Sequence, residues 1–172
     1  MKKILHICNT SFYLKNFLSS HIDDLINYNY EVHVICHVGD TQFNINKKII
    51  IHNVAFPRSV SPLAFLKAIR NVSKIIKRYN FDCVISHNRN SSIVGRISTF
   101  FSKVPLNIYF AHGFIFHDNQ NFIYRFMSIQ IERFLEKITS YTLSQSQEDI
   151  DFMIKKKYIN PNKITHVGNG IE

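Results

Sequence analysis

The segment Ala111-His112-Gly113-Phe114 carries the residue types that place an imidazole at the edge of a sheet. It follows an apolar run of strand length, and a glycine directly after a strand can adopt a positive φ, which aims the preceding ring over the sheet edge. A histidine in that position can exchange a proton or hydrogen-bond a ligand hydroxyl. His112 is therefore the candidate catalytic residue, and the alternative is a histidine that only satisfies loop carbonyls.

Hydrogen-bonding side chains also follow the other apolar runs. In a parallel sheet the carboxyl ends of the strands share one edge, where ligands bind near the switch in strand order. The segments expected at that edge are Asn9-Thr10-Ser11-Phe12-Tyr13, Val38-Gly39-Asp40, Asn88-Arg89-Asn90, His112-Gly113-Phe114 and Gln145-Ser146. Asn9, Thr10 and Ser11 either offer donors to a hydroxylated ligand or only cap the next helix. His87 and Asn88 are placed to line the same cleft, although nine histidines make coincidence easy.

Two kinds of site are disfavoured. The loop Asn9-Thr10-Ser11-Phe12-Tyr13-Leu14 has no glycine, so a close backbone approach to a pyrophosphate is not expected there. No pair of histidines with an acidic residue has metal-ligand spacing, and Cys8, Cys36 and Cys83 have no C-x-x-C spacing. We therefore predict no bound metal.

Alternating strands and helices must position these residues. The strand candidates are mostly continuous Val-, Ile- and Leu-rich runs, typical of strands buried on both faces. They are Lys3–Cys8, Glu31–His37, Ile49–Val54, Cys83–His87, Leu106–Ala111, Tyr141–Ser144 and Lys163–Val167. Helical spacing and caps predict helices over Leu14–Tyr28, Pro62–Tyr79, Ser91–Ser102, Phe122–Thr139 and Gln147–Tyr158. This order predicts an α/β domain with a doubly wound, mainly parallel, Rossmann-like sheet and helices on both faces.

Aromatic residues recur in these helices at the spacing of a stripe that faces a core. They include Phe17, Phe100, Phe101, Phe126 and Phe134.

The composition bounds the class of protein. With 172 residues, of which 45% are hydrophobic, the chain is long enough for one domain with its own core. The three cysteines, an odd number beside apolar runs, are expected as reduced core residues in a reducing compartment. His6 interrupts the apolar start, which favours a first strand over a signal peptide. No apolar stretch approaches the roughly 18 residues of a spanning helix, so we predict a cytoplasmic protein that is at most membrane-associated.

The net charge of +9 favours an anionic partner. Pro62–Tyr79 is a basic amphipathic helix, and its basic side is either a solvated outer face or a surface for anionic lipid. Nucleic acid is disfavoured, because the sequence has no RNP aromatic consensus, no zinc-finger spacing and no clear helix-turn-helix. The candidate lipid-facing residues are Lys67, Arg70, Lys74 and Lys77.

Three segments in order resemble one protein family. They are Ala111-His112-Gly113-Phe114, residues 131–149, and Val167-Gly168-Asn169-Gly170-Ile171-Glu172. Together they are similar to the N-terminal domain of glycosyltransferase family 4, the retaining GT-B enzymes that build capsular, exopolysaccharide and lipopolysaccharide glycans. The likeness covers essentially the whole chain. It implies one half of a GT-B fold, with residues 1–167 as the acceptor-side domain and 168–172 as the start of a junction to an absent donor domain.

The resemblance also implies roles for residues. His112 would lie at the interdomain cleft near the acceptor and the reaction centre, Gly113 would let the backbone approach the sugar, and Ser144 would line the cleft farther along. The loop that faces the acceptor, which contains glycines in many members, corresponds to Asn9, Thr10 and Ser11.

The implied activity is the retaining transfer of a sugar from a nucleotide-sugar donor to a lipid-linked saccharide in surface polysaccharide biosynthesis. The nucleotide sugar would bind to the absent C-terminal domain or to a separate subunit, so we expect this chain to be inactive alone and to carry no cofactor. An anionic membrane surface is a further expected partner. The rival interpretation is a non-catalytic, flavodoxin-like α/β module that binds a small anion or a protein partner.

Overall fold

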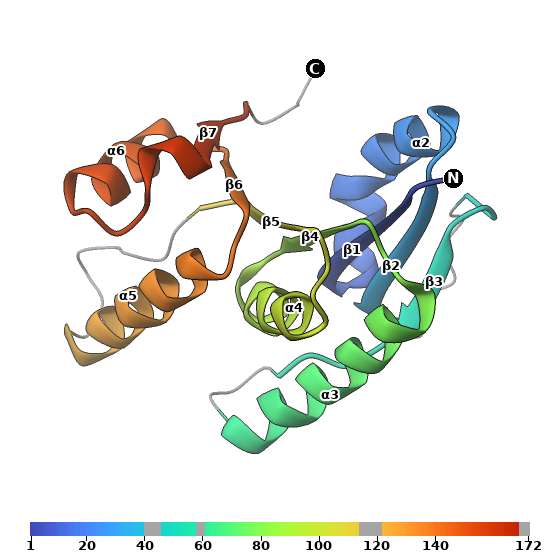
Figure 1. Ribbon diagram of the computed structural model, residues 1–172, viewed down its shortest axis with the longest axis horizontal. Coiled ribbons are helices and arrows are strands. Elements are labelled where there is room, and N and C mark those ends of the chain that lie inside the picture. The colour runs from blue at the N-terminus through green and yellow to red at the C-terminus, as the bar shows by residue number, and fades with distance from the viewer. Residues whose placement is uncertain (40–45, 58–60, 114–121, 169–172) are drawn as a thin grey trace.

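The computed structural model describes residues 1–39, 46–57, 61–113 and 122–168. Within these residues one seven-stranded sheet crosses the molecule in the order β3-β2-β1-β4-β5-β6-β7 (Figure 1). Every neighbouring pair of strands is parallel. The strands are β1 (Lys3–Thr10), β2 (Glu31–His37), β3 (Ile50–Asn53), β4 (Cys83–His87), β5 (Leu106–Ala111), β6 (Tyr141–Ser144) and β7 (Ile164–His166). The prediction of a parallel, doubly wound α/β sheet is confirmed.

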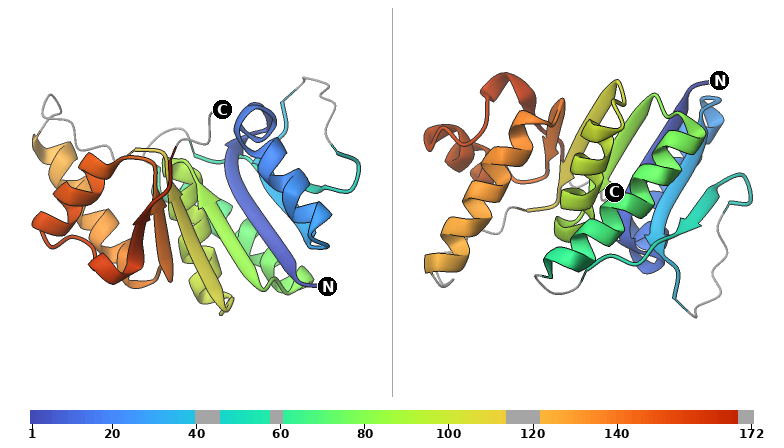
Figure 2. Two further views of the ribbon diagram at one scale, coloured as in Figure 1. Left: turned by 90° about the horizontal axis from the view of Figure 1, so that it is seen from above. Right: turned by 60° about the horizontal axis from the view of Figure 1, so that its bottom comes forward.

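Helices alternate with the strands and lie on both sides of the sheet (Figure 2). The turn η1 and the helix α2 cover one face, where Leu14 and Ile22 are buried. The helices α3 and α4 cover the other face, where Val72 and Val94 pack with Leu5. The helical elements are α1 (Ser11–Tyr13), the π-helical turn η1 (Leu14–Leu18), α2 (Ser19–Asn27), α3 (Pro62–Tyr79), α4 (Arg89–Phe101), α5 (Phe122–Lys137), α6 (Gln147–Lys155) and the 3₁₀ turn η2 (Pro161–Lys163).

The central strands are buried on both faces, as their apolar runs predict. In β1 the five residues from Ile4 to Cys8 are all buried. Because side chains alternate along a strand, Leu5 and Ile7 face α3 and α4, whereas His6 and Cys8 face α2. Cys8 is buried and not disulfide-bonded, in agreement with its predicted core position, and the same holds for Cys36.

The strand order switches direction between β1 and β4. From β1 the chain builds outward through β2 and β3, and then returns through α3 to β4 on the other side of β1. The connections after β1 and β4 therefore leave in opposite directions, and a crevice opens at the carboxyl edge between them. The structure thus places the polar segments after β1 and β4 side by side.

Some element boundaries differ from the predicted ones. β1 continues to Thr10, because Thr10 pairs with His37 of β2. Asn9 and Thr10 therefore belong to the end of the strand and not to the loop. The helix predicted from Leu14 already begins at Ser11 and contains the π-helical turn η1, and α4 begins at Arg89.

Several apolar helix faces are less covered than predicted. Phe17 is 62% exposed, Phe101 69% and Phe126 55%. In the described part of α5 only Ile129 and Leu135 are buried. The prediction that these aromatics face a core is therefore wrong, because helical spacing shows that apolar residues share a face and not which neighbour covers it.

The helix α3 follows its prediction residue for residue. The Ser61 hydroxyl accepts a hydrogen bond from the Ala64 amide at 3.5 Å, Pro62 takes the first helical position, and Asn80 ends the helix in the left-handed conformation. The four predicted lipid-facing residues of this helix, Lys67, Arg70, Lys74 and Lys77, are exposed, and so is Arg78.

Two predictions concern segments that are only partly described. The junction predicted at 168–172 falls, apart from Gly168, outside the described residues, as does Phe114. Among the helices that the structure describes, none combines the length and the apolar character that crossing a bilayer requires.

Candidate functional site

His112 lies directly after β5, at the carboxyl edge of the sheet. Gly113 has a φ of 139°, a conformation that glycine adopts without steric cost. The His112 Nδ1 lies 3.0 Å from Gln145 Oε1, and its Nε2 meets the Tyr13 hydroxyl. Partial burial lowers the pKa of His112 and outweighs the opposing hydrogen bond to Gln145. The ring is therefore mainly neutral at pH 7.

Asn88 joins β4 to α4 in an unusual backbone conformation. Its φ of 56° and ψ of 164° lie in a region essentially reserved for glycine, which costs on the order of 1–3 kcal/mol. The backbone N–H of Asn9 donates to Asn88 Oδ1 at 3.1 Å, and Asn9 Oδ1 accepts from the backbone N–H of Ser91 at 3.2 Å. The two asparagines thus tie the ends of β1 and β4 together, and strain of this kind is concentrated at functional sites.

Two buried imidazoles continue inward from His112. His87 Nδ1 lies 3.5 Å from His112 Nε2, and His87 Nε2 lies 3.1 Å from His6 Nδ1. Burial, reinforced by neighbouring imidazoles, lowers the pKa of His6 to about 3 and that of His87 well below its usual value. Both rings are therefore neutral at pH 7. We call these three residues, His6, His87 and His112, the imidazole row.

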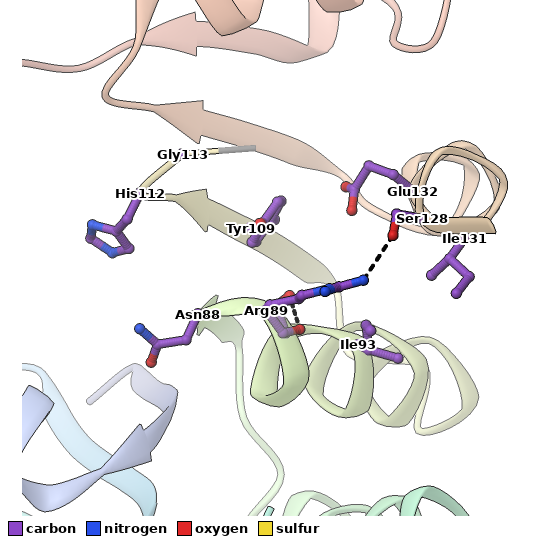
Figure 3. A pocket seen from close by; sticks show the side chains of 10 residues that line it. Asn88, Arg89, Ile93, Tyr109, His112, Gly113, Ser128, Ile131 and Glu132 are labelled. Carbon is purple, nitrogen blue, oxygen red and sulfur yellow. Dashed lines mark hydrogen bonds between the residues drawn. The ribbon is translucent and has the colours of Figure 1, made fainter. Parts of the chain in front are cut away.

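A cavity of about 230 Å³ opens beside His112, between the start of α4 and α5 (Figure 3). On the α4 side, Arg89 donates to Ser128 Oγ of α5 at 2.8 Å and to the Tyr124 hydroxyl. A guanidinium at this wall suits a hydroxylated or anionic ligand. The lining side chains that carry polar groups are Asn88, Arg89, Ser92, Tyr109, His112, Ser128 and Glu132.

A buried ion pair fixes the far wall of this cavity. Arg96 of α4 is 1% exposed and donates to both carboxylate oxygens of Glu132, at 2.6 and 2.9 Å. Its guanidinium also lies 4.0 Å from the centre of the Tyr109 ring. Burial alone would lower the pKa of Arg96, but the Glu132 carboxylate outweighs burial and leaves that pKa raised. The pair holds α5 against α4 and neutralises the carboxylate beside the cavity.

A larger cavity of about 680 Å³ shares a wall with the first. Arg89, Ile93 and Ile131 line both cavities. The other side chains that line the larger cavity are mainly apolar and include Pro62, Phe65, Ile97, Tyr124, Phe134 and Leu135. A polar cavity and an apolar cavity therefore adjoin at Arg89.

The structure brings some predicted site residues to the cavities. Asn88, His112 and Gly113 line the smaller cavity, and Asn9 lines the larger one. Thr10 caps α1 by accepting the Tyr13 amide at 3.3 Å, and it also lines a third cavity of about 490 Å³.

The remaining predicted residues lie behind this edge. Ser11, His87 and Ser144 are buried. The Ser144 hydroxyl contacts the backbone N–H and carbonyl of Ser146, both at 3.3 Å. Contact of these three residues with a ligand stays a prediction.

Sequence reasoning missed residues that depend on strand order or helix packing. Arg89 and Gln145 were expected only at the edge of the sheet, His6 only within the first strand, and Glu132 was not singled out. A usable signal existed for Arg96, the one charged residue in the sequence from 90 to 102, whereas Glu132 is followed by Arg133 and Glu136 and does not stand out. His6 had none, since only the pairing of β1 with β4 brings it to His87.

A second histidine cluster lies nearer the amino ends of the strands. His33 Nδ1 lies 2.9 Å from His52 Nε2, and His33 Nε2 lies 2.8 Å from Glu31 Oε1. Among the described residues, no group of three His, Cys, Asp or Glu side chains is arranged to hold a metal ion.

Comparison with known sequences gives a family. A sequence model of Glycosyltransferase Family 4 matches residues 18–172. An Escherichia coli relative, UDP-Gal:alpha-D-GlcNAc-diphosphoundecaprenol alpha-1,3-galactosyltransferase, is 28% identical over 115 residues. The matched region covers 67% of this chain and 30% of that relative.

Solved structures share the fold at low identity. The lipopolysaccharide outer core galactosyltransferase WaaB, in its apo form, gives a TM-score of 0.70 at 17% identity, covering 100% of this chain and 46% of that one. A glycosyltransferase from Rickettsia africae gives a TM-score of 0.70 at 15% identity, and the match covers 97% of this chain and 42% of that one. The UDP-GlcNAc 2-epimerase from Methanocaldococcus jannaschii gives a TM-score of 0.69 at 17% identity, and the match covers 98% of this chain and 46% of that one.

These structural matches establish the fold, one half of a GT-B protein, and not the activity. The match to the family covers far more than half of the chain. The chain therefore belongs to glycosyltransferase family 4.

Proposed function

We propose that this chain is the acceptor-binding half of a retaining glycosyltransferase that transfers a sugar from a nucleotide-sugar donor to a lipid-linked saccharide in surface polysaccharide biosynthesis. The observation that carries the proposal is the convergence of Asn88, His112 and Gly113 on one cavity at the topological switch point. Family membership supports the reaction class. The E. coli relative, whose name specifies a diphosphoundecaprenol-linked acceptor, supports the substrate class.

The smaller cavity suits the saccharide end of such an acceptor. Its wall presents an imidazole, an amide, a guanidinium and hydroxyls, which between them donate to and accept from sugar hydroxyls. Among the described residues other than its chain neighbours, none has an atom within 4 Å of the position where a Cβ on Gly113 would stand, which suits a close approach of a ligand to the backbone there. Neutral His112 can accept a hydroxyl hydrogen, which a protonated ring could not do.

The larger cavity suits the lipid end. Its apolar lining adjoins the polar cavity at Arg89, where an acceptor phosphate would meet a guanidinium. An acceptor with a sugar, a phosphate and an apolar chain would thus find matching surfaces in that order. This arrangement favours a lipid-linked saccharide over a free sugar.

The proposed reaction breaks the bond between the donor sugar C1 and the diphosphate oxygen, and forms a bond from C1 to the acceptor oxygen on the same face. The acceptor hydroxyl proton leaves with the diphosphate. His112 and Asn88 would orient the attacking hydroxyl, and fixed donors would stabilise the charge on the diphosphate without an obligatory metal. The donors for the nucleotide would come from the C-terminal domain or a separate subunit.

The proposed location is the cytoplasm, at the inner face of the membrane. The exposed basic side of α3 would be attracted to anionic lipid by about 1 kcal/mol per basic residue near the surface. Peripheral binding of this kind would bring the acceptor site to its lipid-linked substrate.

The substitution His112→Ala tests the proposal in this chain joined to its donor-binding domain. We expect kcat/KM for sugar transfer to fall by at least about a hundredfold, because a positioned hydrogen-bonding group is lost. The matched control is His52→Ala, which removes an imidazole hydrogen bond on β3, outside the cavity lining. Transfer is measured with a lipid-linked saccharide and several nucleotide sugars, and folding by circular dichroism. Equal turnover in the two folded variants would remove His112 from the site.

A further inference from the structure

The imidazole row crosses from the interior of the sheet to the candidate site. His6 lies in β1, His87 ends β4 and His112 follows β5, so three different strands contribute one ring each. The planes of the first two rings differ by only 15°, and their centroids are 5.4 Å apart. The second and third are 5.8 Å apart at 30°. The order of the row follows from the strand order β1-β4-β5.

Each ring of the row has one N–H and one lone pair. His6 and His87 are 0% and 1% exposed, so the charged form of either ring would be strongly disfavoured. A neutral imidazole donates from one nitrogen and accepts at the other. A hydrogen bond between two such rings therefore fixes which nitrogen of each carries the proton.

The outer end sets the direction of the row. Gln145 Oε1 accepts from His112 Nδ1 at 3.0 Å, so His112 Nε2 carries the lone pair. That lone pair accepts from the Tyr13 hydroxyl and from His87 Nδ1 at 3.5 Å. His87 Nε2 then accepts from His6 Nδ1 at 3.1 Å. In this arrangement all three rings are Nδ1–H tautomers.

The inner end agrees with the same direction. Among the described residues, His6 Nε2 is a buried atom without a hydrogen-bond partner. In the direction given above this atom is a bare lone pair, whereas in the opposite direction it would be a buried N–H. Unpaired buried N–H groups are rarer than under-satisfied acceptors.

We propose that His6 and His87 are positioning residues that hold His112 as the Nδ1–H tautomer, with its Nε2 ready to accept a hydrogen bond from a hydroxyl of a bound sugar. The sugar hydroxyl would take the place of the Tyr13 hydroxyl on that nitrogen. The inference rests on the proposed function of His112 and adds two buried residues that never touch the substrate. An Nε2–H tautomer would instead present a donor, which cannot accept a hydrogen bond from the attacking hydroxyl and so cannot orient it in this way.

Histidine-labelled ¹⁵N spectra of this chain at neutral pH test the tautomers without any substrate. Two-bond ¹⁵N–¹H correlations identify the protonated nitrogen of each ring, and the loss of signals in His112→Gln assigns the outer ring. We expect pyrrole-type Nδ1 and pyridine-type Nε2 signals for all three residues of the row. An Nε2–H signal from His112 would overturn the proposal.

Two substitutions at the middle residue separate positioning from packing. His87→Leu removes the N–H that faces His112, and we expect the ratio of Nδ1–H to Nε2–H at His112 to fall about fivefold, the equivalent of one hydrogen bond. His87→Asn keeps an N–H near the Nδ1 position and should retain the ratio. An unchanged ratio in folded His87→Leu would overturn the proposal, and if that variant does not fold, the spectrum of the unmodified chain decides.

Kinetics of the joined enzyme connect the tautomer to transfer. His87→Leu should lower kcat in proportion to the Nδ1–H fraction that the spectra show to be lost, and by at most about fivefold, because only that fraction is competent, and His87→Asn should restore most of it. The spectra and the His112→Ala assay are independent of one another. A wrong tautomer in the spectra together with an inactive His112→Ala would end this inference alone. A fully active His112→Ala would instead end the proposed role of His112 in the site and leave the tautomer assignment standing.

Discussion

Burial and charge pairing decide what single residues near the site contribute to the fold. Arg96 is a fully buried cation whose charge is matched by Glu132, and its Nε has no partner among the described residues. A buried pair of this kind adds little net stability, since desolvation offsets the attraction, but the removal of one partner leaves an uncompensated charge. The pair therefore acts mainly by fixing α5 beside the cavity.

The substitution Glu132→Gln should destabilise the chain by about 3–5 kcal/mol, because the Arg96 guanidinium stays buried and charged. The double substitution Arg96→Met with Glu132→Leu should recover most of that loss. Urea unfolding followed by circular dichroism gives the free energies of unfolding. The matched control is Glu136→Gln on the same helix, whose ion pair with Lys163 spans 4.0 Å and is partly exposed, so we expect a change of at most about 1 kcal/mol. Equal effects of the two Glu→Gln substitutions would contradict the assignment of a buried charge pair.

The helices that frame the site differ in how well the sequence specified them. Ser61, Pro62 and Asn80 give α3 a cap, a first residue and a left-handed end, so local chemistry alone defined its limits. The apolar stripe of α5 was equally clear, yet Phe122 is 80% exposed and Phe134 59%. Local signals set where a helix begins and ends, whereas its cover depends on packing partners that periodicity does not encode.

The basic side of α3 gives a prediction for membrane binding. Replacing Lys67, Lys74 and Lys77 with Gln should weaken binding to vesicles with anionic lipid by about a hundredfold, since each lysine contributes about 1 kcal/mol. Co-sedimentation with vesicles of increasing anionic content measures the effect. The charge-matched control replaces Lys155, Lys156 and Lys157, which follow one another at the end of α6 and are exposed. Equal losses in both variants would show that net charge, and not α3, drives the attraction.

At the scale of the whole molecule, the sequence predicted the sheet and only part of the site. Mainly apolar runs such as Val32–Cys36 favour burial on both faces, and this requirement leads directly to a parallel sheet between helix layers. The edge position of His112 followed from Gly113 directly after it and from the rule that the carboxyl ends of parallel strands share one edge of the sheet. The imidazole row and the Arg96–Glu132 pair did not follow, because they depend on which strands and helices become neighbours.

The final prediction concerns the chain on its own. It spans 30% of the E. coli galactosyltransferase and 46% of WaaB, and the guanidinium at its cavity, that of Arg89, already donates to Ser128 and Tyr124. Sugar transfer places negative charge on a departing diphosphate, which requires several fixed donors. We therefore expect no turnover from this chain with a lipid-linked saccharide and nucleotide sugars. Addition of a donor-binding domain, in the same or a separate polypeptide, should restore it.

Binding of the acceptor provides the control for that experiment. The chain alone should still bind the lipid-linked saccharide in equilibrium titrations, because both cavities are formed by its own residues. Turnover without a partner would contradict the proposed division of labour between this chain and a donor-binding domain. If the chain shows neither turnover nor acceptor binding, a donor-binding domain is needed to shape the acceptor site. In that case the binding-competent conformation would be rare in the chain alone, and the apparent affinity for the acceptor would fall with its population.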